Sequence, residues 1–276
     1  MDDIEFEQVN NIPRHTDFVK GLVDDKNDPA LGYKVRAHLT SLGLEPALVD
    51  ANDMRAHPPV YHPKVAYDAL KEGIYNAYQH LGLDVTRDPS LKDTPKRFAA
   101  MFVGELTKGL NYDFFPKCTA TPNGVEVKVD IPTTSSSVGG SDSGLRVATV
   151  GAYDQMVLVN KIRITSLCEH HLQTIDGFAH IAYVPNEKVI GLSKLARVAE
   201  FFAARPQIQE RMTDQIYHAL SYILGTQNVA VSINATHFCM RARGVKQPES
   251  GTTTNKMGGL FMTELGLREE FLNATR

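Results

Sequence analysis

Two cysteines and one histidine, drawn from two distant segments of the chain, have the residue types that hold a metal ion. The first segment, Cys168-Glu169-His170-His171, directly follows a predicted strand. A Cys-x-x-His spacing alone is weak evidence, because a buried thiol beside two histidines in a turn explains it as well.

The second segment strengthens the metal hypothesis. In the predicted strand that begins at Val229, alternate side chains share a face, and that face is apolar through Ile233 before it changes to His237 and Cys239. An inward face that turns from packing residues to ligand residues indicates a site at the end of a core. The competing interpretation, in which His237 and Cys239 continue the core, stays open without Cys168.

The number of ligands bears on the chemistry. Structural zinc usually has four protein ligands, whereas catalytic zinc has three and a water molecule. Cys168, His171 and Cys239 supply three, and either His170 or His237 would close the site as a fourth. Adjacent side chains seldom point the same way, so we expect His170 to lie beside the metal as a proton donor.

Two further groups of residues have types suited to a nucleotide. Ser193 and Lys194 open a predicted helix with Arg197 one turn later, and a helix N-terminus with added positive charge favours phosphate. Solvated surface charge is the more usual explanation of such a trio, and the pattern alone favours it. Gln209 and Glu210 begin the next helix, where an acidic residue either compensates the helix dipole or accepts hydrogen bonds from a guanine edge.

Composition excludes several classes of protein. The chain has 276 residues and a formal net charge of -3, which gives no general electrostatic case for nucleic acid. It has no apolar run long enough to span a membrane, and its acidic start is unlike a signal peptide. Three cysteines form no disulfide framework, so reduced cysteines and a cytoplasmic location are expected.

The N-terminal part is predicted to be helical. Periodicity predicts helices over residues 31–42 and 64–82, joined by a Pro-rich linker at 56–63. A third helix is opened by Asp93-Thr94-Pro95 and ends near Gly109. The residues of the helix at 64–82 that we expect to point inward are Val65, Ala69, Ile74, Tyr78 and Leu81. We divide the chain into an N-terminal extension, residues 1–60, and a catalytic domain, residues 61–276.

The remainder is predicted to form a sheet with helices on it. Strands are expected at 125–129, 145–150, 156–165, 178–184 and 229–243, with a Ser/Gly-rich mobile loop at 133–144. Two apolar helices are expected at 193–203 and from about Pro206, and a short one near 264–274. The predicted class is α+β, with an antiparallel sheet covered by two helices on one face.

With these motifs together, the chain resembles the GTP cyclohydrolase I family from about residue 31 to the C-terminus. The segments that carry the resemblance are Asp93-Thr94-Pro95-Lys96-Arg97, Ser166-Leu167-Cys168-Glu169-His170-His171, Gly191-Leu192-Ser193-Lys194-Leu195-Ala196-Arg197, Arg205-Pro206-Gln207-Ile208-Gln209-Glu210 and the segment from His237 to Val245. The resemblance implies a tunnelling fold (T-fold), in which subunits join their sheets into rings. It further implies a homodecamer of two stacked pentamers with active sites between subunits.

The resemblance also implies an activity and residue roles. The reaction would convert GTP and water to formate and 7,8-dihydroneopterin triphosphate, the first step toward folate-type pterins. Cys168, His171 and Cys239 match ligands of Zn²⁺, and His170 matches the general acid. His237 matches a histidine that takes part in later proton transfers. Gln209 and Glu210 match the guanine anchor, and the matched triphosphate and ribose contacts are Arg97, Ser193, Lys194, Arg197 and Arg243.

Residues 1–30 and the Ser/Gly-rich stretch at 133–144 depart from the family pattern without touching a matched motif. Two alternatives stay open: another T-fold enzyme that acts on a pterin or a deazaguanine, and a non-catalytic scaffold with structural zinc. A zinc nucleobase deaminase is disfavoured, because its H-x-E and P-C-x-x-C signatures are missing.

Overall fold

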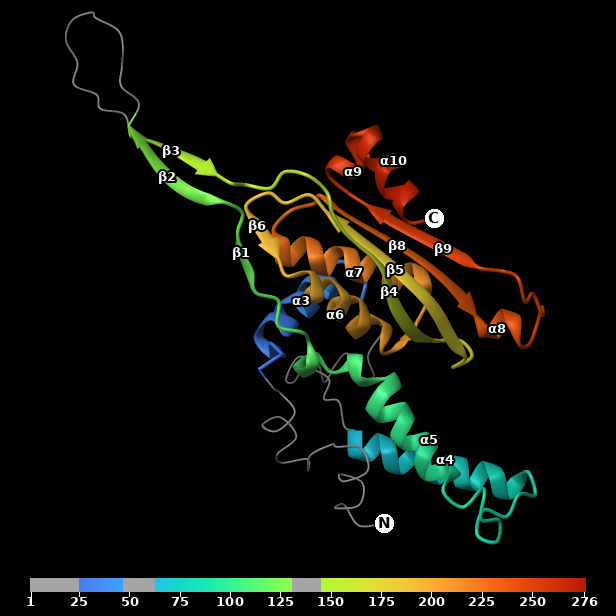
Figure 1. Ribbon diagram of the computed structural model, residues 1–276. Helices are drawn as coiled ribbons and strands as arrows, with labels where there is room; N and C mark the ends of the chain where they lie inside the picture. Colours follow the sequence, from blue (N-terminus) through green and yellow to red (C-terminus); the bar gives the residue numbers. More distant parts are fainter. Residues whose placement is uncertain (1–24, 47–62, 131–144) are drawn as a thin grey trace, which may run out of the picture.

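The computed structural model describes residues 25–46, 63–130 and 145–276 (Figure 1). The predicted linker at 56–63 except for its last residue, the loop at 133–144 and most of the predicted extension lie outside these ranges. Within them, helices and strands are mixed as expected for an α+β protein.

The core of the fold is a five-stranded sheet with the strand order β7-β4-β5-β8-β9. All neighbouring strands run antiparallel except β4 and β7, which are parallel. The strands are β4 (Val157–Cys168), β5 (Thr174–Tyr183), β7 (Pro206–Gln207), β8 (Val229–His237) and β9 (Thr252–Met257).

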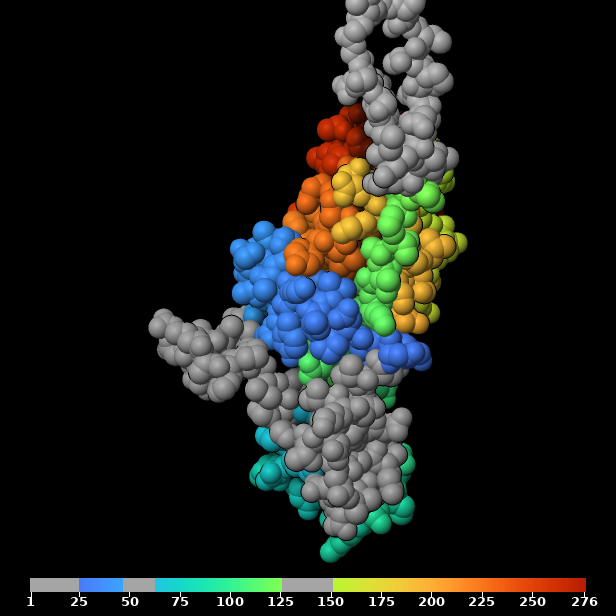
Figure 2. All heavy atoms as spheres, turned by 90° about the vertical axis from the view of Figure 1, so that its left-hand side faces the viewer, coloured from blue at the N-terminus to red at the C-terminus, as the bar shows by residue number. Residues whose placement is uncertain are grey.

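Two long helices, α6 (Leu192–Ala203) and α7 (Gln209–Leu224), lie against one face of this sheet, as predicted (Figure 1). Each carries an apolar stripe, and side chains such as Val198 and Leu220 are fully buried against β8 residues such as Val231. A further helix, α3 (Pro29–Ser41), packs on α7 and buries Val35 and Leu39 (Figure 2). The main core therefore lies between the sheet and these helices.

The opposite face of the sheet is covered at one end, which the sequence did not indicate. Ala182 of β5 and Ala230 of β8 alternate with the residues that face α6 and α7, and they pack with Phe261 and Phe271. Phe261 belongs to α9 (Leu260–Thr263) and Phe271 to α10 (Leu265–Ala274), the predicted C-terminal helix.

The helices of the N-terminal part form a separate pair. Helix α4 (Pro63–His80) packs against α5 (Thr94–Met101), and the pair projects away from the sheet (Figure 1). The expected inward face of α4 is only partly correct: Ile74 and Tyr78 are half-buried, but Val65, Ala69 and Leu81 are exposed, and Tyr67 is the residue buried against α5. A helix with one partner has a narrow buried stripe, whose position depends on that partner.

Three predicted boundaries also change. The long strand at 229–243 ends at His237, and the short helix α8 (Phe238–Arg241) follows it. The α-helix that opens at Thr94 ends at Met101 and continues as a π-helical segment. The helix predicted at 31–42 runs from Pro29 to Ser41, and Leu42 is exposed beyond its end.

The smaller elements complete the path between α5 and the main sheet. Strand β1 pairs with β6 and β2 pairs with β3, both antiparallel, and the second pair is built from the two segments predicted as strands. The elements are η2 (Phe102–Leu106), η3 (Lys108–Leu110), η4 (Tyr112–Phe114), β1 (Ala120–Pro122), β2 (Val125–Asp130), β3 (Leu145–Val150) and β6 (Lys188–Ile190). None of the helices in the described ranges has the length and apolarity to cross a bilayer.

Candidate metal centre and surrounding site

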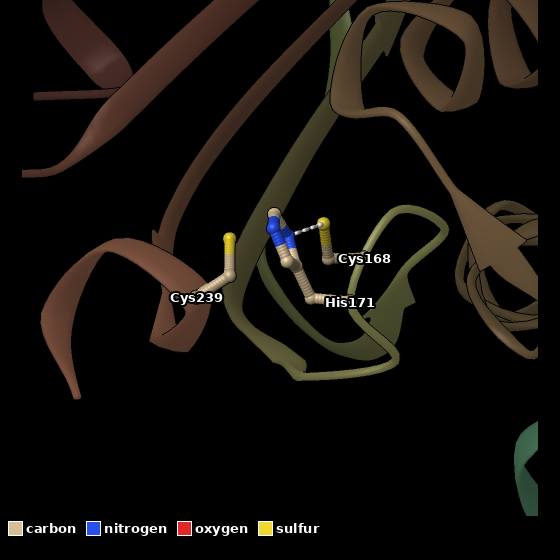
Figure 3. Close-up of side chains that lie close together, drawn as sticks. All are labelled: Cys168, His171 and Cys239. Carbon is tan, nitrogen blue, oxygen red and sulfur yellow. Dashed lines mark hydrogen bonds between the residues drawn. The ribbon is translucent and has the colours of Figure 1, made fainter. Parts of the chain in front are cut away.

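The structure brings the three predicted metal ligands together at one end of the sheet. The Sγ atoms of Cys168 and Cys239 and a ring nitrogen of His171 all lie within 4.8 Å of one another. The imidazole lies between the two sulfur atoms, and its Nδ1 is 3.7 Å from Sγ of Cys168 (Figure 3). Among the described residues this is the one group with at least three such donors in mutual reach.

Strand pairing explains why two distant segments meet there. Cys168 is the last residue of β4, and the chain turns through residues 169–173 into β5. The start of β5 pairs with the end of β8, with Ile175 opposite His237. The β4–β5 turn therefore lies at the same end of the sheet as the first turn of α8, which carries Cys239.

The turn itself is held by its backbone. The amide nitrogen of Cys168 donates to the carbonyl of Gln173 at 2.8 Å, and that of Leu172 donates to the carbonyl of Cys168 at 2.8 Å. Leu172 has a φ of +52°, a left-handed conformation that costs a bulky residue about 1–2 kcal/mol. Strain of this kind persists where the surrounding structure determines the conformation, and it clusters at functional sites.

The donors suit a metal ion chemically. Burial raises the pKa of Cys239, and the neighbouring Cys168 raises it further, through a hydrogen bond between the two thiols and through the repulsion that two adjacent thiolates would have. A bound cation reverses this preference, since it stabilises both thiolates at once. Cys168 is buried and His171 is exposed, so the cluster reaches from the core to the surface.

His170 lies beside the cluster and outside it. Its Nδ1 is 3.9 Å from Sγ of Cys168, and its side chain is exposed. The group of donors that lie within mutual reach contains His171 and neither His170 nor His237. This arrangement favours the three-ligand interpretation over a closed four-ligand site.

His237 contacts Gln209, at the start of α7. The His237 Nε2 and Gln209 Oε1 atoms are 2.8 Å apart. Burial lowers the pKa of His237, and the charge of Glu210 opposes that effect. Gln209 is buried and Glu210 is exposed, so the two adjacent residues of the predicted guanine anchor differ in their access to a ligand.

The predicted phosphate contacts do not gather at the cluster in one chain. Ser193 and Lys194 are at the start of α6, and twelve residues of helix span about 18 Å before β7 pairs with the end of β4. Arg197 is on the same helix, and its charge and that of Lys194 both act on the buried thiol of Cys118.

The two remaining arginines differ from each other. Arg243 is exposed, and its charge lowers the pKa of Cys239, so it lies near the cluster. Arg97 is on α5, where its guanidinium is 3.7 Å from the carboxylate of Asp93. If both arginines bind one ligand, as predicted, the groups that bind this ligand come from different parts of the molecule.

Sequence reasoning missed an ion pair between α7 and the turn that carries the candidate metal ligands. Arg211 on α7 forms a salt bridge with Glu169, which lies between Cys168 and His170. No spacing signal pairs a residue in a turn with one on a helix so far along the chain, and only the fold reveals this contact.

The fold and the cluster together define a mixed helix-and-sheet protein with a possible metal site of two cysteines and one histidine at one end of its main sheet. Residues 70–276 match the family model described as GTP cyclohydrolase I. Relatives named GTP cyclohydrolase 1 include one from Aeromonas salmonicida, 44% identical over 242 residues, which cover 88% of this chain and 95% of the relative. One from Yersinia enterocolitica is 45% identical over 207 residues, 75% of this chain and 82% of the relative. One from Yersinia pestis is 47% identical over 196 residues, which cover 71% of this chain and 77% of the relative. The chain belongs to the GTP cyclohydrolase I family.

Proposed function

We propose that this protein is a Zn²⁺-dependent GTP cyclohydrolase that converts GTP and water to formate and 7,8-dihydroneopterin triphosphate. Membership of the family supports the substrate and the reaction. The observation that carries the proposal is the convergence of three donors, Cys168, His171 and Cys239, in a chain of that family.

The donor set favours zinc. Two thiolates and one imidazole are soft and borderline ligands, which suit Zn²⁺ better than the oxygen-preferring Mg²⁺ or Ca²⁺. Three protein ligands leave one tetrahedral position for solvent, as in catalytic sites. The bound metal would supply a Lewis acid that lowers the pKa of water to about 7.

The side chains around the cluster supply binding and proton transfer. We assign to His170, which is exposed beside the cluster, the protonation of the ring nitrogen next to carbon 8 of guanine, which makes that carbon more electrophilic. Glu210, exposed on the first turn of α7, accepts hydrogen bonds from the guanine edge. His237 lies within the same region for the proton transfers that follow ring opening.

The phosphate-binding half is contributed by a neighbouring chain. In one chain, the length of α6 separates Ser193 and Lys194 from the end of β4, and Arg97 lies on the separate helical pair. We therefore propose that the T-fold chain works as a homodecamer of two stacked pentamers with sites between subunits, in the cytoplasm. Contacts that bind the triphosphate at one end of the substrate and the base at the other hold the reacting atoms between them in alignment.

Turnover tests the proposed reaction. The metal-loaded protein is incubated with GTP, and formate and the fluorescent pterin obtained after oxidation are measured. Equal amounts of both products are expected, whereas metal-loaded protein that yields neither would rule out the reaction.

Complementation tests the shared site. Lys194→Ala and Cys239→Ala chains are each expected to be inactive, and co-assembled equal amounts regain about a quarter of wild-type turnover, since one chain can supply the metal and its neighbour the phosphate contacts. A site built within one chain would regain none.

A further inference from the structure

The turn that carries two of the metal ligands is joined to α7 by one ion pair. The guanidinium of Arg211 contacts the carboxylate of Glu169, and the two side chains are only 17% and 29% exposed. By comparison, Arg163 and Asp176, which pair across β4 and β5, are 67% and 34% exposed. The Arg211–Glu169 pair is therefore shielded from solvent, where a charged hydrogen bond is stronger than at the surface.

A buried glutamine holds the same arginine from the other side. Nε of Arg211 donates to Oε1 of Gln207 at 3.2 Å. The Gln207 amide nitrogen donates to the carbonyl of Phe202 at 2.9 Å and to Oε1 of Gln215 at 2.7 Å, so the orientation of its amide is determined. Gln207 thus presents its oxygen, and not its nitrogen, to Arg211.

Strand β7, to which Gln207 belongs, also fixes the backbone of the turn. The amide nitrogen of Glu169 donates to the carbonyl of Gln207 at 3.0 Å, and β7 pairs with the end of β4 at Cys168. Glu169 is consequently attached through both its backbone and its side chain. Its position between Cys168 and His170 means that movement of Glu169 moves both neighbours.

Arg211 also lies next to the proposed base-binding residue. It directly follows Glu210 in the first turn of α7. The Arg211 guanidinium therefore connects the β4–β5 turn, which carries the candidate metal ligands, with the first turn of α7, which carries the carboxylate proposed to bind guanine. Catalytic constellations need their groups held within about 0.5 Å, which supporting hydrogen bonds of this kind provide.

We propose that Arg211 is a positioning residue that sets the metal-binding turn relative to the guanine-binding end of α7, through Glu169 and Gln207. This role rests on the proposed function. Neither side chain belongs to the group of candidate metal ligands or to the proposed substrate contacts, and the loss of the pair alters the geometry of those groups.

The test compares two ion pairs on the same fold. Arg211→Met and Glu169→Gln remove the charges at similar side-chain volume, and the double variant completes a mutant cycle. The matched controls are Arg163→Met and Asp176→Asn at the exposed pair on β4 and β5. For each variant, the metal dissociation constant, the absorption spectrum with Co²⁺ in place of zinc, kcat, KM for GTP and Tm are measured.

The expected result is a loss of about 10- to 100-fold in metal affinity or in kcat for both Arg211→Met and Glu169→Gln, the range found for groups that support metal ligands. The Co²⁺ spectrum should change, and the double variant should be no worse than the poorer single variant, because the two residues act through each other. The control variants should stay within about twofold of wild type. If Arg211→Met fails to fold, Glu169→Gln and Arg211→Lys carry the same comparison.

Wild-type metal affinity, Co²⁺ spectrum and kinetics in Arg211→Met or Glu169→Gln would overturn the proposal. So would equal losses in the control pair, or a fall in Tm with an unchanged spectrum. If the wild-type protein does not act on GTP, the proposed reaction fails, yet metal affinity and the Co²⁺ spectrum still decide whether Arg211 positions the turn.

Discussion

Nε2 of His237 lies 2.8 Å from Oε1 of Gln209, which joins the end of β8 to the start of α7. The amide nitrogen of Gln209 is directed to the carbonyls of Ile233 and Thr252, each at 3.0 Å. A nitrogen that faces these acceptors leaves the Gln209 oxygen as the acceptor for His237. His237 therefore donates from Nε2, and its Nδ1 is the nitrogen that remains for other partners.

Replacing Gln209 with leucine tests this contact. The change leaves two buried carbonyls and His237 without their partner, so we expect the free energy of unfolding to fall by about 1–3 kcal/mol and GTP turnover to be lost. Glu210→Gln is the matched control, because Glu210 is exposed and adjacent. It should raise KM for GTP without a change in stability. Urea unfolding and steady-state kinetics measure both, and a Gln209→Leu protein as stable as Glu210→Gln would contradict the account.

His170 and Cys239 are expected to differ in what their loss removes. His170→Ala should keep the metal and lose about 100- to 10,000-fold in turnover, the range that general acid catalysis contributes. Cys239→Ala should lose metal and turnover together, because it removes one of three donors. Metal content by atomic absorption, measured beside formate release, separates the two. Loss of metal in His170→Ala would make His170 a ligand and the present assignment wrong.

His180 is expected to make the fold sensitive to acid. It is buried in β5, where its Nδ1 lies 3.4 Å from the backbone nitrogen of Lys161 at a bulge in β4. Burial, and to a lesser degree the charge of Lys161, lowers the pKa of His180 below its usual value of 6.5. The unfolded chain therefore binds more protons as the pH falls through about 6.5, and stability declines from there until the folded protein is protonated as well.

His180→Asn removes this titrating group, so the free energy of unfolding should change less between about pH 7 and pH 5 than in the wild type. His80→Asn, at an exposed histidine of α4, is the control and should follow the wild type. Urea unfolding at several pH values measures the slopes. Equal slopes for His180→Asn and the wild type would show that His180 does not contribute.

Local patterns predicted the main helices and the ligand set. The apolar stripes of α6 and α7 have one wide buried face each, so their period is visible in the sequence. Cys168 was predicted to follow a strand, and Cys239 to lie on the inward face of the strand at 229–243, where packing residues give way to ligand residues. The strand predicted at 229–243 ends at His237, six residues earlier than expected, and Cys239 reaches the site from the helix α8. The alternation of apolar and polar residues cannot reveal where this strand ends, because the chain leaves the sheet at the point where the inward face becomes polar.

Other features depend on contacts that no local pattern carries. Tyr67 of α4 is buried because α5 lies on that side, whereas Val65 has no such partner among the described residues. The Glu169–Arg211 pair depends on the packing of α7 beside the β4–β5 turn. The substrate-binding roles that the family resemblance implies for Arg97 and Lys194 remain predictions, because one chain does not bring these residues to the candidate metal ligands.

X-ray absorption at the zinc edge of the metal-loaded protein tests the central claim most directly, because it counts the sulfur and lighter donors around the metal. The account predicts two sulfur donors, from Cys168 and Cys239, one imidazole nitrogen, from His171, and one solvent oxygen that is exchanged when GTP or a competing anion binds. Four protein donors with no exchangeable solvent would contradict it, and the site would then be a structural one.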